Sequence, residues 1–309
     1  MDNTKHEFHS FEMPSGVTVD SIEAELYKCD WVQIKDENGV AIMGRPMGNY
    51  ITIETNILEH GRTGEIDEIA KTVCEYLIKI MAVCDIADKD SVLVVGIGNR
   101  DVTADSLGVR VAEKVLATRH ITNELECITG KAVRSVSVIS PGVRGITGIS
   151  TAESIKSICG AIKPSLVILV DALAALQTSR LCSTIQITDT GLSPSAGLLG
   201  HSKAQVVNSD YLGIPVVGIG IPTVINAATI ITDAFNLLPN PYGNGNESLG
   251  DLMFERINRH IGELFTSVSP FVATKEIDAA IHYSSYLLSS AINMALFQDD
   301  WFHMPHNCY

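Results

Sequence analysis

Two short apolar runs, residues 92–95 and 166–170, constrain the fold of this chain more than any other feature. Their valine, leucine and isoleucine content is typical of strands that are buried on both faces in a parallel α/β sheet. The first run stops at a Gly-x-Gly-Asn turn with Asp105 just beyond it, and the second stops at Asp171. Such sheets build their ligand sites at the carboxyl ends of the strands, so we expect both acids to lie near one site.

Strand and helix patterns alternate beyond residue 90, which predicts an α/β fold with a mainly parallel sheet flanked by helices. The expected strands are residues 92–95, 133–139, 166–170, 183–187 and 216–219. The expected helices are residues 65–85, 105–117, 151–162, 172–181 and 223–237. Ser150 and Glu153 form a capping-box signature at the start of the helix at 151–162.

The two ends of the chain differ in pattern from this core. Alternating runs between residues 31 and 56 flank a turn rich in glycine and proline at 44–48, which predicts a small antiparallel appendage. Two helices are expected within residues 251–297. We predict a single domain built from an N-terminal segment (1–30), the appendage (31–64), the α/β core (65–238), and a linker with a C-terminal helical extension (239–309).

Composition limits the classes of function. The 309 residues are 46% hydrophobic and can bury a large core, yet the apolar stretch at 216–231 is interrupted by Gly220, Pro222 and Asn226, so no membrane span is expected. The first residues lack the order of a signal peptide, and the 7 cysteines are scattered, which favours a cytoplasmic protein with reduced thiols. A net charge of −14 argues against direct nucleic-acid binding and is compatible with a basic protein partner.

Common catalytic and nucleotide-binding motifs do not fit this chain. After Gly96 and Gly98, the third glycine of a dinucleotide fingerprint would fall at Asp101, where an acid would repel a pyrophosphate. The sequence contains neither a Gly-Lys-Ser/Thr phosphate loop nor a Gly-x-Ser-x-Gly elbow. We therefore expect neither a nucleotide cofactor nor a serine hydrolase.

Asp105 and Asp171 have both a chemical and a structural interpretation. Structurally, Asp171 would cap a helix starting at residue 172, and Asp105 would be an acid in the first turn of a helix. Chemically, two carboxylates a few Å apart cannot both ionise easily, so one keeps a proton while the other activates water. A metal site would be the competing chemistry, but it needs a histidine or a further carboxylate nearby. The dense cluster of metal-ligand residues, His303, His306 and Cys308, lies in the C-terminal tail.

Several other residues are candidates for binding or supporting roles. The loop SPGVRGITG, with Gly142, Arg144, Gly145 and Thr147, could bind a substrate carbonyl through its N–H groups, or could simply be a tight connection between strand and helix. Asn99 is either a site residue or the former of an Asx turn. Asp189 is either a supporting carboxylate or a turn cap.

Five blocks in this order and spacing resemble the germination protease (spore protease) family. They are GIGNRDVTADSLG, ISPGVRGITGIST, KPSLVILVDALAA, STIQITDTGLSPSAG and LGIPVVGIGIPTVINAATI. The resemblance is dense over residues 90–235 and looser over residues 31–54. It implies a cytoplasmic endopeptidase of the forespore or spore core that degrades small acid-soluble spore proteins at germination. It also implies a homotetramer, made as a zymogen, with a phosphorylase/hydrolase-like fold similar to hydrogenase maturation proteases.

The resemblance also implies a catalytic pair of aspartates, which fall on Asp105 and Asp171, and no cofactor. Three features depart from the family pattern. Residues 1–30 contain no stretch like the family's Arg-Thr-Asp-Leu-Ala-type processing site, Asn226 stands where the family has an aspartate, and the extension from residue 239 is longer. Two alternatives stay open: a relative that binds spore proteins without cleaving them, and a metal-dependent maturation protease. For the latter, Asp105-Ser106 replaces an acidic pair and no counterpart of the histidine ligand is evident.

Overall fold

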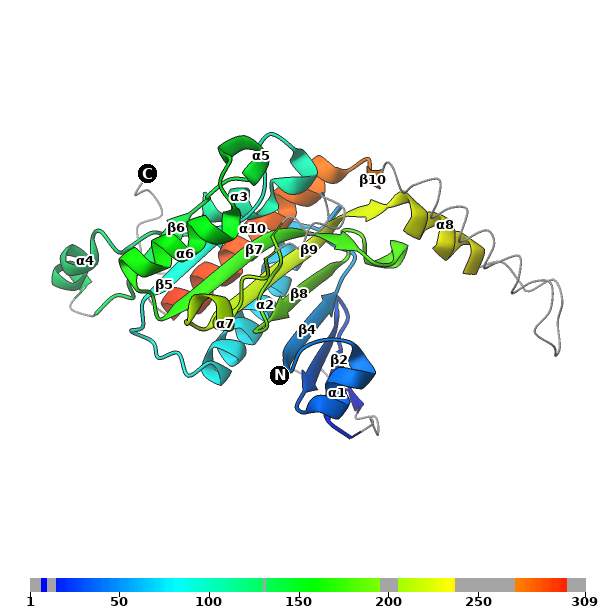
Figure 1. The fold of residues 1–309 in the computed structure, drawn as a ribbon, viewed down its shortest axis with the longest axis horizontal. Coiled ribbons are helices and arrows are strands. Elements are labelled where there is room, and N and C mark those ends of the chain that lie inside the picture. Colours follow the sequence, from blue (N-terminus) through cyan, green and yellow to red (C-terminus); the bar gives the residue numbers. More distant parts are fainter. Residues whose placement is uncertain (1–6, 10–14, 130–131, 195–204, 237–269, 299–309) are drawn as a thin grey trace.

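The computed structural model describes residues 7–9, 15–129, 132–194, 205–236 and 270–298. Within these ranges the chain forms one mixed sheet with helices on both faces (Figure 1). The strands lie side by side in the order β1 (Glu7–His9), β2 (Val17–Glu23), β3 (Lys28–Ile34), β4 (Gly48–Glu54), β8 (Thr184–Thr188), β9 (Val216–Asn226), β7 (Leu166–Ala175), β5 (Val92–Gly96) and β6 (Val136–Ile139), and β10 (Phe271–Val272) pairs with β9.

The parallel part of the sheet is smaller than the sequence predicts. Only the neighbours β9, β7, β5 and β6 run parallel among the described strands, and the other pairings are antiparallel. The prediction of a mainly parallel sheet is therefore wrong, because β8 runs against β9. Only residues 176–183 separate β7 from β8, which is too short for the crossover that a parallel strand needs.

The expected appendage is part of this sheet. Strand β4 pairs with β8 from Tyr50↔Thr188 to Glu54↔Thr184, so the antiparallel strands continue the central sheet. The first alternating run ends earlier than predicted, because residues 37–43 form helix α1 (Glu37–Met43). Asp36 caps this helix by accepting from the N–H of Gly39 at 2.9 Å, and Gly44 ends it in the left-handed region at φ 63°.

Strands β7 and β9 extend beyond the predicted strand ends at residues 170 and 219. They stay paired as far as Ala175↔Ile225, so the helix predicted at 172–181 is wrong and helix α8 (Ala227–Asn236) starts later than predicted. Strand pairing overrides the helical preference of the alanine-rich segment after residue 171. Asp171 consequently lies within a strand and does not cap a helix.

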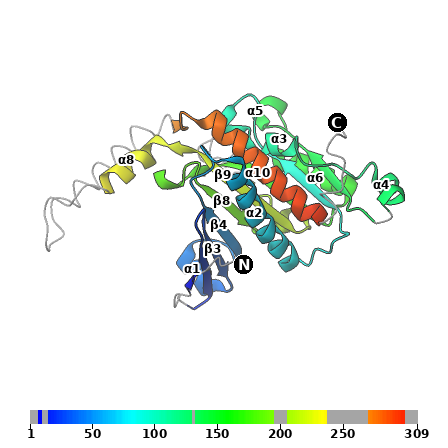
Figure 2. The same ribbon diagram turned by 180° about the vertical axis from the view of Figure 1, so that it is seen from behind.

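Helices cover the two faces of the sheet unequally. The first face packs against α2 (Thr63–Val83), α3 (Leu107–Ala112) and α10 (Ile277–Phe297), seen in front in Figure 2. On the other face, α6 (Thr151–Ile162) and α7 (Ser209–Leu212) cover the parallel strands (Figure 1). The remaining helical segments are η1 (Thr103–Asp105), α4 (Thr122–Thr129), α5 (Arg144–Thr147) and η2 (Thr178–Arg180).

Several helix predictions are confirmed. Helix α2 follows the apolar spacing, and α6 begins with the predicted capping box of Ser150 and Glu153. In the C-terminal extension, α10 packs on the core, and its buried Asn293 accepts from the N–H of Leu116 and donates to the carbonyl of Lys114, both at 3.0 Å. Residues 237–269, which include the other expected helix, lie outside the described residues. No helix in the described ranges is long and apolar enough to cross a membrane.

Candidate active site

A cavity of about 590 Å³ opens on the face of the sheet that α6 and α7 cover only in part. Side chains alternate along a strand, so Asp171 and Leu173 of β7 share this face with Val167 and Leu169, which pack in the cluster that contains α6. The cavity lies farther along the strands, where residues of β4, β8 and the end of β9 contribute to its lining. Its walls include Asp105, Asp171, Leu173, Gln186, Thr188 and Thr223.

Asp171 lies in the middle of β7, opposite Gly220 of β9, with 5% of its surface exposed. Burial raises its pKa well above the ordinary aspartate value of 3.8, and the nearby negative charge of Asp105 raises it further. The N–H of Ala172 donates to Oδ1 at 2.8 Å, which opposes these effects only in part. Both sequence-predicted carboxylates thus line one cavity, and the more buried of the two favours its protonated form.

Asp105 ends the short helix η1, just after the Gly-x-Gly-Asn turn. Burial raises its pKa, and the N–H of Asn99, which donates to Oδ2 at 2.9 Å, lowers it. The turn brings this N–H into place because Gly98 adopts φ 127°, and a Cβ there would collide with the carbonyl oxygen of Asp105. Asn99 also forms the predicted Asx turn, because its Oδ1 accepts from the N–H of Asp101 at 3.0 Å.

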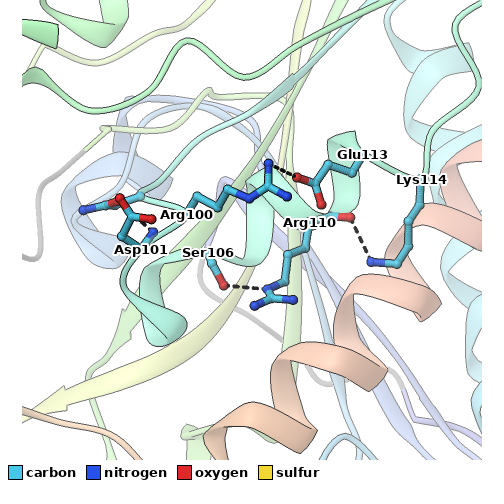
Figure 3. Close-up of polar contacts among 7 residues, drawn as sticks. Arg100, Asp101, Ser106, Arg110, Glu113 and Lys114 are labelled. Atoms are coloured by element: carbon cyan, nitrogen blue, oxygen red, sulfur yellow. Dashed lines mark hydrogen bonds and ion pairs between the residues drawn. The ribbon is translucent and has the colours of Figure 1, made fainter. Parts of the chain in front are cut away.

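The loop that carries Asp105 is tied to helix α3. The guanidinium of Arg110 donates from Nε to Oγ of Ser106 at 3.0 Å, and Arg100 pairs with Glu113 at 2.9 Å. Figure 3 shows how these side chains lie. The ammonium group of Lys114 donates to the carbonyl of Arg110 at 3.1 Å. The contacts of Arg100 and Ser106 join the residues on either side of η1 to α3 and its C-cap Glu113, which helps to position Asp105.

A buried threonine holds η1 from the side of the sheet. Thr223, 1% exposed, donates from Oγ1 to the carbonyl of Ala104 at 2.6 Å. It is the extra residue of a bulge in β9, because the register passes from Leu173↔Pro222 to Ala174↔Val224. Sequence reasoning missed Thr223, since a bulge is created by pairing and leaves no local pattern.

The remaining predicted residues lie outside the lining of the cavity. Both oxygens of Asp189 accept from Asn49, at 2.7 Å from its N–H and 2.6 Å from its side-chain amide, which ties β8 to the start of β4. Asp189 therefore supports the site only indirectly, by holding β4 beside β8.

The glycine-rich loop leads into α5 and α6. Gly142 has φ 75° and its carbonyl accepts from the hydroxyl of Thr151, whereas Arg144, Gly145 and Thr147 are exposed on α5. None of the four predicted loop residues lines the cavity. A role of this loop in substrate binding stays a prediction.

The mouth of the cavity has features that sequence reasoning did not single out. Val102 and Leu176 are apolar yet 46% and 73% exposed there. Arg45, over the ring of Tyr50 at 5.3 Å, supplies a positive charge. The predicted turn at 44–48 could have pointed to Arg45 as a candidate site residue, because turn residues are exposed and commonly carry function.

Metal-ligand residues are sparse around this site. Within the described ranges, no group of three or more histidine, cysteine, aspartate or glutamate side chains is placed to hold a metal ion. His303, His306 and Cys308 lie outside the described residues.

Comparison with known proteins assigns the chain to a family. The family model described as germination protease matches residues 1–249. The chain belongs to the germination protease family. It is similar to the germination protease of Caldanaerobacter subterraneus (40% identical, covering 92% of this chain and 89% of the relative). The corresponding values are 36%, 94% and 91% for Clostridium perfringens, and 33%, 91% and 88% for Clostridium acetobutylicum.

Membership of the germination protease family makes the chain a peptidase, which is consistent with the expected endopeptidase. Asn226, which replaces the aspartate expected from the resemblance, lies away from the two carboxylates. It ends β9 and accepts from the N–H of Ala228 at 2.8 Å, as a cap at the start of α8, and it does not line the cavity.

Proposed function

We propose that the chain degrades small acid-soluble spore proteins during germination and that Asp105 and Asp171 activate the attacking water. The observation that carries this proposal is that two carboxyl groups, each with a raised pKa, line one cavity and interact with each other. Pairs of acids whose environments separate their pKa values are typical of general acid–base catalysis.

The surroundings of the two acids suggest different roles. Asp171 is the more buried and carries the additional repulsion from Asp105, so the shared proton stays on Asp171. Asp105 accepts a hydrogen bond from the N–H of Asn99, and this bond favours the carboxylate form of Asp105. Asp105 is then the general base and Asp171 the general acid.

The reaction follows from this division. Asp105 removes a proton from water while the oxygen of the water attacks the scissile carbonyl, whose oxygen accepts a hydrogen bond from protonated Asp171. The carbon–nitrogen bond then breaks as Asp171 transfers its proton to the leaving nitrogen. The pair again holds one proton, now on Asp105, and its return to Asp171 restores the starting state.

The wider expectations from the resemblance belong to the same proposal. They are a homotetramer, synthesis as a zymogen and action in the cytoplasm of the forespore or spore core. The support for these three expectations is that the chain belongs to the germination protease family.

One experiment tests the proposed activity. The purified full-length chain is incubated with a small acid-soluble spore protein from about pH 5 to about pH 8, with and without chelator, and fragments are followed by mass spectrometry. Cleavage that chelator leaves unchanged supports the two-aspartate mechanism, whereas loss on chelation supports a metal-dependent protease. Binding without cleavage would support the non-proteolytic alternative.

A further inference from the structure

The end of strand β7 projects beyond its neighbour β5. Residues 166–170 pair with β5, and the last contact on that side is the N–H of Ile97 donating to the carbonyl of Val170 at 2.8 Å. From Asp171 to Ala175, β7 pairs only with β9 among the described strands. Within the described residues, this edge of β7 has no partner strand after Val170, and we call it the free edge.

The backbone groups that face this edge can be assigned by alternation. Leu166 and Val170 form hydrogen bonds on the side of β5, whereas the N–H of Val167 donates to Pro215 on the side of β9. Successive residues of a strand alternate between its two sides. Ala172 and Ala174 therefore direct their N–H and carbonyl groups toward the free edge.

One of these groups already shows the lack of a partner strand. The N–H of Ala172 donates to Oδ1 of Asp171, the carboxylate of the preceding residue. A strand N–H normally meets the carbonyl of a neighbouring strand. The free edge thus presents the carbonyl groups of Ala172 and Ala174 and the N–H of Ala174 next to the two carboxylates, at a half-buried position, and the N–H of Ala172 is held by Asp171.

We propose that the substrate binds as an extended polypeptide segment that adds to this edge of β7 through hydrogen bonds to Ala172 and Ala174. The complementarity is between backbones, because a row of alternating N–H and carbonyl groups matches another extended chain. In this position the substrate's backbone passes the two carboxylates, and every second side chain faces the cavity. The inference rests on the proposed proteolytic function and specifies how its substrate is held.

Backbone N-methylation of a peptide tests this binding mode without altering the protein. Overlapping synthetic peptides of a small acid-soluble spore protein are titrated against full-length Asp171→Asn by fluorescence anisotropy, so that binding needs no cleavage. The tightest binder is then methylated at one backbone nitrogen at a time. We expect losses of roughly three- to tenfold at alternate residues, because each methyl group removes one hydrogen bond. Uniform tolerance of N-methylation, or the absence of any binding peptide, would overturn the inference.

A protein variant provides the reciprocal test. Ala174→Pro removes one N–H from the edge, where proline is tolerated, and Ala174→Ser keeps it as a matched control. We expect the proline variant to bind the peptide several-fold more weakly than the serine variant does, with similar melting temperatures for both. If the proline variant instead changed the oligomeric mass while N-methylation was tolerated, the edge would bind a second copy of the chain, and the substrate proposal would be wrong.

The two proposals can fail separately. The same peptides are offered to the unaltered chain, and cleavage is followed by mass spectrometry. If N-methylation weakened binding at alternate residues but the unaltered chain cleaved none of the peptides, the proteolytic function would be contradicted. The edge of β7 would then remain a peptide-binding site. Cleavage with tolerance of N-methylation would contradict the edge and leave the protease.

Discussion

At the scale of single residues, Asp171 combines its proposed chemical role with a cost in stability. Its carboxyl group is buried in the central sheet and faces the negative charge of Asp105. Ionisation there lacks the solvation that water supplies, so the folded protein binds the proton more tightly than the unfolded chain does.

The first prediction concerns catalysis. Asp171→Asn keeps an oxygen to accept from Ala172 but cannot donate a proton to the leaving nitrogen, so kcat/KM should fall by at least about 10²-fold. Steady-state cleavage of a spore protein measures this. The exposed Asp20→Asn makes the same chemical substitution on β2, outside the cavity, and should leave activity unchanged. Activity within twofold of the unaltered chain in Asp171→Asn would rule out the mechanism.

The second prediction concerns pH and stability. The pKa of Asp171 is raised on folding, so its stabilising contribution is complete below about pH 3.8 and is lost as the pH rises through the higher pKa of the folded state. Asp171→Asn has no such loss. Its melting temperature relative to the unaltered chain should therefore increase from acidic to neutral pH. A difference that stays constant with pH, compared with Asp20→Asn, would contradict the assigned shift.

A third prediction concerns Asn226. Asn226→Asp restores the acid that the family resemblance leads us to expect, and aspartate can accept from the N–H of Ala228 equally well while favouring the positive end of α8. We expect an unchanged or slightly higher melting temperature and activity within about threefold of the unaltered chain. A large gain in kcat/KM would instead connect this position with the catalytic pair.

At the scale of elements, the strands and α3 meet so closely that side chains are excluded. A Cβ on Gly108 would collide with the carbonyl oxygens of Val170 and Ile97, and one on Gly96 would collide with that of Gly108. This close packing holds α3, and with it η1 and Asp105, against the ends of β5 and β7. The glycines after residue 95 thus allow the close packing that positions the carboxylate of Asp105. This role differs from the phosphate binding that glycines provide in a dinucleotide fingerprint.

The fourth prediction tests this contact. Gly108→Ala should lower the free energy of unfolding by about 1–3 kcal/mol and reduce activity, because backbone atoms must move and carry Asp105 with them. Gly160→Ala is the matched control, since Gly160 is exposed within α6 and its Cβ would meet nothing within 4 Å. The control should be neutral or stabilising by up to about 1 kcal/mol. Chemical denaturation measures both, and equal stabilities would contradict the packing argument.

At the scale of the whole molecule, one continuous sheet joins the N-terminal strands to the site. The pairing of β4 with β8 brings Tyr50 and Thr52 to the cavity beside Gln186 and Thr188. Asp189 strengthens this join by accepting two hydrogen bonds from Asn49. We therefore expect the N-terminal strands to unfold together with the core.

The fifth prediction addresses that cooperativity. Asp189→Ala should lower the free energy of unfolding by about 2 kcal/mol, because it leaves two donors of the nearly buried Asn49 unpaired. Calorimetry should show a single transition, shifted to lower temperature, with Asp20→Ala as the control. Two separate transitions would show that the N-terminal strands are an independent unit.

Local pattern alone predicted much of this protein. Apolar runs located β5 and the first half of β7, helical spacing located α2 and α6, and the acids that follow the two runs proved to line one cavity. These predictions succeed because burial on both faces of a strand, or on one side of a helix, leaves a periodic trace in the sequence.

Only the tertiary structure decided the remainder. The direction of β8, the continuation of β7 past Asp171, the bulge at Thr223 and the joining of β4 to the central sheet all depend on which strands become neighbours. Pairing between segments far apart in the chain overrides local preference, as in the alanine-rich end of β7, and no local pattern records it. The sequence therefore determined which acids to consider, whereas the sheet decided their burial, their interaction and the free edge beside them.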